Sequence, residues 1–289
     1  MGPLPAPAVW TEPLPEATPP AGMALYQLPT ATFETRAIFA FRGGSFRDKR
    51  HFAATAILVR HPKGDFLIDA GFGAGAAAHR QAQPRLARVP YQAISTAREQ
   101  LDAAGYDVNT LRGVLLTHTH WDHVSGLDEL PVPIWTNEGE LRHAKERSDG
   151  KVFREVSAGH QIHQYDFDGP AYLGFSSSFD VYGDGSVVIV LAGGHTRGSV
   201  IIFVTLPDAR RYAFIGDLVW QLDGIRQRVD RPLLTRTLAD VDPGRVRAGL
   251  LRVIALADLM HVVPSHDRTA YDGIPRLPDR LMPVTPESA

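Results

Sequence analysis

The stretch Thr117-His118-Thr119-His120-Trp121-Asp122-His123 is the most informative in the sequence, because it contains three imidazoles and one carboxylate within six residues. A packed core has no use for that density of metal-binding groups, whereas zinc takes histidine nitrogen and carboxylate oxygen readily. The apolar run 113–116 before it predicts a buried strand, and residues 124–127 predict the start of a short helix. We therefore expect the ligands on the turn where a strand ends, which is where an open α/β sheet presents its chemistry.

Four other apolar runs end in a residue that can bind or support a metal. They lead into Asp69, into Gly193-Gly194-His195, into Gly216-Asp217 and into Ser265-His266. One histidine beside glycines is a weak signal alone, but after the stretch 117–123 it becomes a strong one. For Asp69, an ordinary turn aspartate is the alternative interpretation.

The segment 118–123 has the form His-x-His-x-Asp-His and resembles the signature of the metallo-β-lactamase superfamily of metal-dependent hydrolases. The resemblance extends to the later motifs and covers about residues 30–270. It implies an α/β fold, a four-layer αββα sandwich of two mixed β-sheets flanked by helices.

The resemblance also implies a set of seven metal ligands that matches the dinuclear branch of the family. One metal would take His118, His120 and His195, the other would take Asp122, His123 and His266, and Asp217 would bridge them. Two divalent ions are implied as cofactors, zinc first, with manganese, iron or cobalt as alternatives because the same ligands accept them. Asp69 is implied as a support of the ligands, since ligating histidines usually need an oxygen partner on their other ring nitrogen.

Such a site implies hydrolysis. A hydroxide held between two metals, with its pKa lowered to roughly 7, is a nucleophile at neutral pH. It would attack an electrophilic carbonyl or phosphorus, while the metals polarise the substrate oxygen and stabilise the developing oxyanion. Asp122 or Asp217 would then pass a proton to the leaving group.

Within the family, the sequence best resembles the lactonase-like branch, which includes bacterial acyl-homoserine lactone hydrolases. We therefore expect a dinuclear hydrolase that cleaves a lactone or ester. A phosphotriesterase is the alternative, because Trp220 stands where those lactonases often carry tyrosine and would form a larger apolar wall. A glyoxalase II-like thioesterase is a further alternative. A binding protein of this fold without turnover would usually lack a ligand, and none is missing.

Three residues are candidate substrate contacts. Phe46 lies at the tip of a flexible loop, Arg197 stands where the family usually has proline, and Trp220 follows Asp217 by three residues. The plain alternatives are a hairpin loop for Phe46, a solvent-facing side chain for Arg197 and a core indole for Trp220. Four arginines in residues 224–236 are interpreted as parts of a solvated loop.

The composition excludes several classes of partner. The net charge of −2 gives no electrostatic case for nucleic acid or an anionic membrane. The absence of cysteine means that any metal must be held by nitrogen and oxygen. No run of about 18 apolar residues exists, so no segment is expected to span a membrane. A small-molecule substrate is the expected partner.

Residues 1–22 are rich in proline and are expected to form an arm without regular structure. The arm is interpreted as a disordered tail, or alternatively as a strap across a partner subunit in a homodimer. It lacks the basic start and apolar core of a signal peptide, so a cytoplasmic protein is expected, with a removed secretion signal as the alternative. Residues 23–289 are expected to form one hydrolase domain.

Two helices are expected to lead into ligand-bearing strands. One runs from Pro90 to Gly105, with Ile94, Leu101 and two alanines on one face. The other opens at Asp242-Pro243-Gly244 and carries apolar residues on one face up to residue 257. A third helix, capped by Asn137 with Glu140 three positions on, is expected to end near residue 148.

Overall fold

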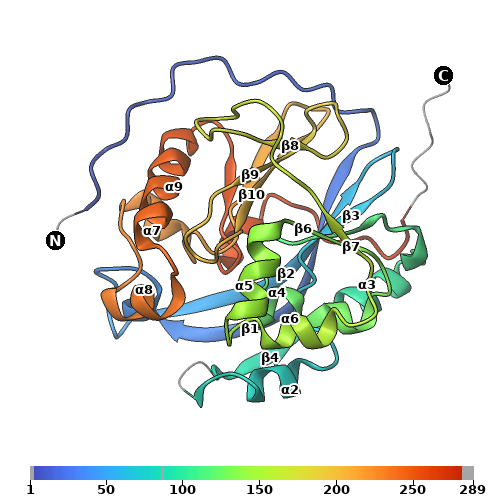
Figure 1. The fold of residues 1–289 in the computed structure, drawn as a ribbon, viewed down its shortest axis with the longest axis horizontal. Coiled ribbons are helices and arrows are strands. Elements are labelled where there is room, and N and C mark those ends of the chain that lie inside the picture. The colour runs from blue at the N-terminus through green and yellow to red at the C-terminus, as the bar shows by residue number, and fades with distance from the viewer. Residues whose placement is uncertain (1–2, 86–87, 282–289) are drawn as a thin grey trace. The chain divides into compact units, whose positions relative to one another are not determined.

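The computed structural model describes residues 3–85 and 88–281 (Figure 1). The chain divides into two compact units, which are described separately. The first unit comprises the described parts of Met1–Pro19, Glu34–Phe52 and Asp166–Ala270, and the second comprises those of Pro20–Phe33, Ala53–Tyr165 and Tyr271–Ala289. Sheet and helix occur in both, and the predicted α/β class with two mixed β-sheets flanked by helices is confirmed.

The seven-stranded sheet belongs mainly to the second unit and has the order β4-β1-β2-β3-β5-β6-β7. Its strands are β1 (Ala24–Arg36), β2 (Lys49–Arg60), β3 (Phe66–Ile68), β4 (Tyr91–Ala93), β5 (Gly113–Leu115), β6 (Ile134–Thr136) and β7 (Ile162–Gln164). Strands β3, β5, β6 and β7 run parallel, whereas β2 pairs with β3 and β4 pairs with β1 in antiparallel fashion. Because parallel strands end at the same edge, the residues after β3, β5 and β6 meet there.

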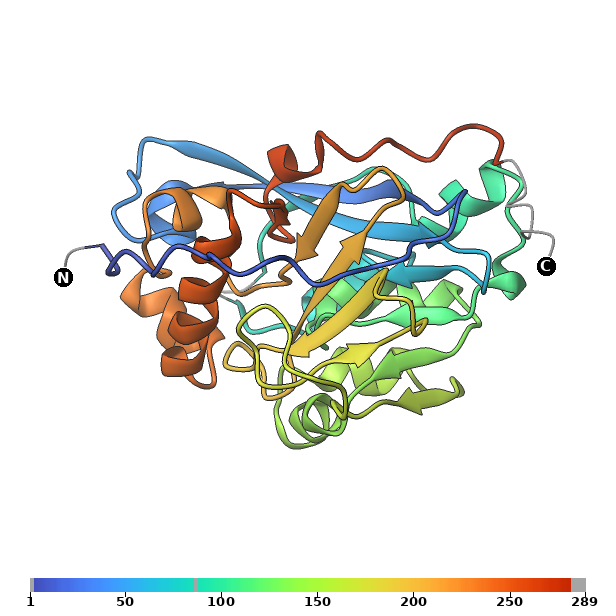
Figure 2. The same ribbon diagram turned by 90° about the horizontal axis from the view of Figure 1, so that it is seen from above.

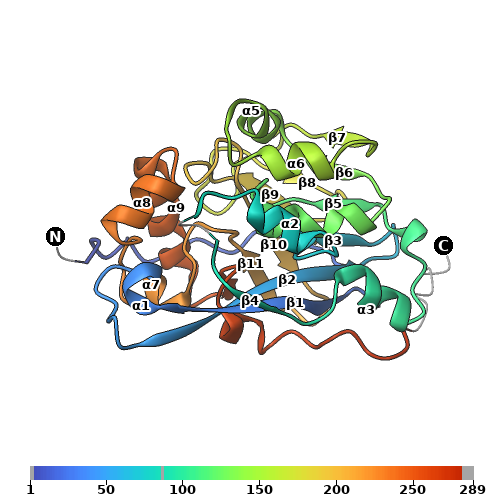
Figure 3. The same ribbon diagram turned by 90° about the horizontal axis from the view of Figure 1, so that it is seen from below.

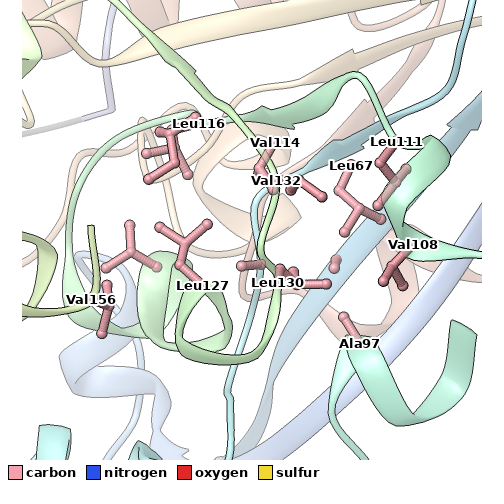
Figure 4. Close-up of a cluster of buried hydrophobic side chains, with 14 of the residues drawn as sticks. Leu67, Ala97, Val108, Leu111, Val114, Leu116, Leu127, Leu130, Val132 and Val156 are labelled. Atoms are coloured by element: carbon pink, nitrogen blue, oxygen red, sulfur yellow. The ribbon is translucent and has the colours of Figure 1, made fainter. Parts of the chain in front are cut away.

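Apolar side chains from this sheet and from several helices form the core of the second unit (Figure 4). Leu67 of β3 and Val114 of β5 are fully buried and pack in one cluster with Ala97, Leu127 and Val156. Burying a leucine side chain stabilises the fold by about 1.5–3 kcal/mol. The helices of this unit are α2 (Ala76–Gln81), α3 (Ala97–Ala103), η2 (Val108–Thr110), α4 (Trp121–Val124), η3 (Ser125–Glu129), α5 (Glu138–Glu146) and α6 (Lys151–Val156).

The helix expected from Pro90 begins later than the sequence pattern suggested. Residues 91–93 form β4 instead, and Tyr91 pairs with Phe33 of β1. Helix α3 starts after Thr96, whose side chain accepts from the amide of Glu99, while the Glu99 carboxylate accepts from the amide of Thr96. This capping box satisfies the amides of Thr96 and Glu99. In a helix that began at Pro90, those amides would instead bond to carbonyls of the preceding turn. Ile94, expected on the buried face, is 51% exposed.

The five-stranded sheet belongs to the first unit and has the order β12-β11-β10-β9-β8. Its strands are β8 (Phe179–Asp180), β9 (Val187–Leu191), β10 (Val200–Thr205), β11 (Arg211–Phe214) and β12 (His261–Val263). Strands β8 to β11 pair in antiparallel fashion and β12 is parallel to β11. The residues that follow β11 and β12 therefore leave the sheet at one edge.

Helix α9 (Pro243–Leu256) packs on this sheet, as expected from its apolar face. Asp242 caps it by accepting from the amides of Gly244 and Arg245, and Pro243 occupies the first turn. Val246 and Leu250 join the same buried cluster as the strand residues. The other helices of this unit are α1 (Ala37–Ala40), α7 (Leu222–Arg226) and α8 (Leu233–Ala239), and η4 (Arg268–Tyr271) follows near its end.

The described part of the N-terminal arm, residues 3–22, forms neither helix nor strand, as expected, and is the extended dark-blue trace in Figure 2. It is nevertheless anchored in the first unit. Leu4 is buried and its amide donates to the carbonyl of Arg228 over 2.6 Å, and Trp10 and Leu14 pack against the core. The interpretation as a disordered tail is therefore wrong for this segment. Among the helices that the structure describes, none is long and apolar enough to cross a membrane.

Candidate metal centre

The second unit carries the predicted turn directly after β5. His118 and Thr119 are fully buried there, and His123 in α4 is 3% exposed. Nε2 of His118 lies 3.1 Å from Nδ1 of His120, and the rings of His118 and His123 have centroids 4.0 Å apart. Imidazole nitrogens from neighbouring residues thus converge at a largely buried position. Asp122 lies in the first turn of α4 and is half-buried.

Asp69, at the end of β3, holds this turn in place. Its Oδ1 accepts from the amide of Thr117 over 2.8 Å, and its Oδ2 accepts from the Thr117 hydroxyl over 2.8 Å. The same Oδ2 lies 2.8 Å from Nδ1 of His123. An Nδ1–H that donates to this carboxylate leaves Nε2 of His123 as the lone-pair nitrogen, which is the tautomer that binds a metal. Asp69 has a positive φ of 53°, an uncommon backbone conformation of the kind that clusters at functional sites.

A second buried carboxylate, which the sequence did not single out as part of the site, supports the same turn. Glu140 of α5 is 1% exposed and accepts from both the amide and the hydroxyl of Thr119, over 2.8 and 2.7 Å. Its position on α5 is set by Asn137, whose side chain accepts from the Glu140 amide. Thr119, the residue between His118 and His120, is therefore held by a buried carboxylate of its own.

In the first unit, His195 follows β9 on a turn that requires glycine. Gly194 has φ +95°, and a Cβ at this position would lie 2.6 Å from the amide nitrogen of Val246 in α9. His195 is 2% exposed, and its Nδ1 lies 3.1 Å from Oδ1 of Asp240. This contact orients the ring so that Nε2 faces Asp217, whose Oδ2 is 3.6 Å away.

Asp217 follows β11 and is 6% exposed. Its Oδ2 lies 3.2 Å from Nε2 of His266, which follows β12 in the parallel pair. The ring of Phe52 stacks on His266 with centroids 5.4 Å apart and an angle of 10°. Asp217 thus faces two imidazoles of the predicted ligand set, which come from the ends of two different strands.

Arg231 corrects the interpretation of residues 224–236 as a solvated loop. Its side chain is 1% exposed, pairs with Asp240 and donates to the backbone carbonyl of Asp217. Burial alone would raise the pKa of Asp240, but the Arg231 guanidinium and the bond to His195 hold that pKa below its usual range. Composition and spacing gave no signal for this pair, because an arginine in a polar loop looks the same whether it points in or out.

The three candidate substrate contacts have different surroundings. The indole Nε1 of Trp220 donates to Oδ2 of Asp217 over 2.9 Å, and its ring meets Phe52 edge-on. Phe46 is 64% exposed and carries the guanidinium of Arg36 over its ring. Arg197 is exposed on the turn after His195. Trp220 thus directly contacts a predicted ligand.

The donor sets in both units fit divalent metal ions. Two imidazole nitrogens that face one another at 3.1 Å, as His118 and His120 do, need a shared proton or a shared cation between their lone pairs. The carboxylate of Asp217 with two imidazoles within 3.6 Å offers the nitrogen and oxygen donors that zinc prefers. The carboxylates of Asp69 and Asp240 behind the rings are the usual partners of metal-binding histidines.

Comparison with known proteins supports a hydrolase of this type. The family model described as the metallo-beta-lactamase superfamily matches residues 50–266. The N-acyl homoserine lactonase AttM of Rhizobium johnstonii is 25% identical over 238 residues, which cover 77% of this chain and 84% of that protein.

Two solved structures share the fold. An N-acyl homoserine lactone hydrolase with N-hexanoyl-L-homoserine bound at its catalytic metal centre superposes with a TM-score of 0.66 at 15% identity, covering 87% of this chain and 96% of that one. The dizinc quorum-quenching lactonase AidC gives a TM-score of 0.60 at 16% identity, covering 88% and 90%.

Proposed function

Because the chain belongs to the metallo-β-lactamase superfamily and is a metal-dependent hydrolase, we propose that it hydrolyses a lactone or ester, with N-acyl homoserine lactones as the substrate class. The named activities of its relatives support this choice. The sequence similarity spans most of both chains, so the proposal concerns the whole domain rather than a fragment of it.

The position of Asp217 carries the proposal. We assign His195 to one metal and His266 to the other, and both imidazoles lie within 3.6 Å of this one carboxylate. A bridging ligand would need such a position, because its carboxylate would have to reach the cations held by both imidazoles. His118 and His120 would complete the first ligand set, and Asp122 with His123 the second. Two divalent ions, zinc first, are the proposed cofactors.

When bound, two such ions supply a hydroxide at neutral pH and polarise the substrate carbonyl. The residues of the chain do the rest. Asp69 and Asp240 hold the protons of His123 and His195 on Nδ1, which keeps the other ring nitrogens available as ligands. Ring opening joins a water oxygen to the carbonyl carbon and breaks the bond to the ring oxygen. That oxygen takes up a proton, for which the carboxylates of Asp122 and Asp217 are the proposed carriers.

A substrate panel tests the proposal. Metal-loaded protein is assayed with N-hexanoyl-homoserine lactone, a thioester, a β-lactam, a phosphodiester and a phosphotriester. The lactone is expected to have the highest kcat/KM. A preference for the phosphotriester or the thioester would replace the lactonase assignment, and no hydrolysis of any substrate would contradict the proposed activity.

Asp217→Ala should lower the lactone rate by orders of magnitude, because it removes the bridge. Asp208→Ala is the matched control in the same unit, since that side chain is exposed and pairs with the exposed Arg210. A rate in Asp217→Ala close to that of the control would contradict the bridging role.

A further inference from the structure

A third carboxylate lies behind a ligand histidine, in the second unit. Asp149 occupies the short turn between α5 and α6, which lie next to one another (Figure 3). Its Oδ2 lies 3.6 Å from Nε2 of His120, and its Oδ1 lies 3.2 Å from Nε2 of His143. His143 is on α5 and its side chain is fully buried. Neither Asp149 nor His143 stands in a motif that the sequence indicated.

The backbone places Asp149 without help from its own side chain. A Cβ on the next residue, Gly150, would lie 2.3 Å from the carbonyl oxygen of Ala144, so the turn closes directly on α5. The guanidinium of Arg154 in α6 donates to the carbonyls of Ala144 and Arg147 and ties the two helices together. The backbone of the turn is therefore fixed against α5, and the Asp149 carboxylate that it carries faces His120.

The two nitrogens of the His120 ring have different surroundings. Nδ1 faces Nε2 of His118 at 3.1 Å, where we assign a metal, and Nε2 faces Asp149. His123 and His195 each have a carboxylate on the ring nitrogen that we do not assign to a metal, at 2.8 and 3.1 Å. Asp149 stands in the same relation to His120, at the longer distance of 3.6 Å.

We propose that Asp149, held by His143, is a positioning residue that keeps the proton of His120 on Nε2 and presents Nδ1 to the metal. This inference rests on the proposed metal site. Partners of this kind set the tautomer and orientation of a ligand ring, and their removal typically lowers metal affinity by about 10–100-fold. His143 acts through Asp149, because its Nε2 lies 3.2 Å from the second carboxylate oxygen.

The side chains of His120, His143 and Asp149 also offer ligand atoms within 4.8 Å of one another, which is close enough for a metal of their own. That alternative would take the proton off Nε2 of His120, because His120 would then bind cations through both nitrogens. The positioning role keeps that proton in place. The two assignments therefore predict different tautomers and different metal counts.

The first test uses metal-free protein labelled with 15N in histidine. In the wild type, the His120 resonances should report a protonated Nε2 and an unprotonated Nδ1. Asp149→Ala should populate the other tautomer, whereas Asp149→Asn, which keeps an acceptor oxygen, should restore the wild-type signal. Asp102→Ala, which breaks an exposed ion pair on α3 of the same unit, should change nothing. An unchanged His120 spectrum in Asp149→Ala would overturn the proposal.

The second test measures Zn²⁺ affinity by competition with a chelator. Asp149→Ala should bind its weaker metal about 10–100-fold less tightly, with a smaller loss in Asp149→Asn and in His143→Gln. The proposal would be overturned if Asp149→Ala bound Zn²⁺ as tightly as the wild type. It would also be overturned if the wild type bound three metals per chain and Asp149→Ala bound two. If the wild type bound no metal at all, the proposed function would fail, while the tautomer of the metal-free protein would still report on Asp149.

Discussion

The indole Nε1 of Trp220 lies 2.9 Å from Oδ2 of Asp217 and donates a hydrogen bond to it. The same ring packs edge-on against Phe52 and carries the guanidinium of Arg231 at 5.1 Å from its centroid. The sequence allowed two interpretations of Trp220, a wall of the substrate cleft and a core indole. Its contact with the proposed bridging carboxylate gives it a direct role in holding that ligand.

Trp220→Phe should weaken metal binding about 10-fold, because it keeps an aromatic ring and removes only the donor to Asp217. Chelator competition on metal-free protein measures the effect. Trp10→Phe is the matched control, since among the described residues the buried Nε1 of Trp10 makes no hydrogen bond. Equal affinities in the two variants would show that the Trp220 bond does not hold the ligand.

Arg231→Leu should destabilise the metal-free protein by about 3–5 kcal/mol, because it leaves the buried carboxylate of Asp240 without its cation. Urea denaturation gives the difference in the free energy of unfolding. Arg210→Leu removes an exposed partner of Asp208 and should cost less than about 1 kcal/mol. A loss of stability in Arg231→Leu no larger than in Arg210→Leu would contradict the buried ion pair and favour the solvated loop first expected.

The lowered pKa of Asp240 predicts a loss of stability in acid. The unfolded chain has an ordinary aspartate pKa of about 3.9, so in the window below that value the unfolded state binds more protons than the folded state. The contribution of this carboxylate is therefore complete well above about pH 4 and falls as the pH falls towards the folded pKa. The stability difference between wild type and Asp240→Asn, measured by urea denaturation of metal-free protein, should shrink from pH 6 to pH 3. A difference in the free energy of unfolding that stayed constant over this pH range would contradict the lowered pKa of Asp240.

Gly194→Ala should cost about 1–3 kcal/mol, since a side chain there is strained at φ +95° and meets the backbone of α9. Gly159→Ala separates the cost of backbone strain from the cost of steric overlap, because Gly159 has φ +88° but open space around its Cβ position. The first variant should lose more stability and should also bind metal less tightly, because His195 moves with the turn. Equal losses without a change in affinity would mean that the turn does not position His195.

The fold and the proposed metal ligands could be predicted from the sequence, but most of the residues that support those ligands could not. A ligand follows the end of an apolar strand in each motif, and strand ends can be recognised from the pattern of apolar residues and glycines. Residues 118–123 and Asp217 were identifiable for that reason. Asp69 follows a strand as well, and the family resemblance implied its role as a partner.

Asp149, Glu140 and Asp240 could not be assigned in this way. Each reaches a ligand or its turn from a helix or loop whose position depends on packing elsewhere, such as the close approach of Gly150 to Ala144. The start of α3 was misplaced for a related reason, since pairing of Tyr91 with Phe33 determined the state of residues 91–93. Long-range contacts of this kind leave no periodic pattern in the sequence.

Seven residues are proposed to hold two metals that act together in hydrolysis. Metal-free protein is titrated with Zn²⁺ while the rate of N-hexanoyl-homoserine lactone hydrolysis is followed against equivalents of metal bound per chain. The rate should rise until two equivalents are bound and then stay constant. A maximum at one equivalent, or no lactone hydrolysis with two equivalents bound, would contradict this proposal.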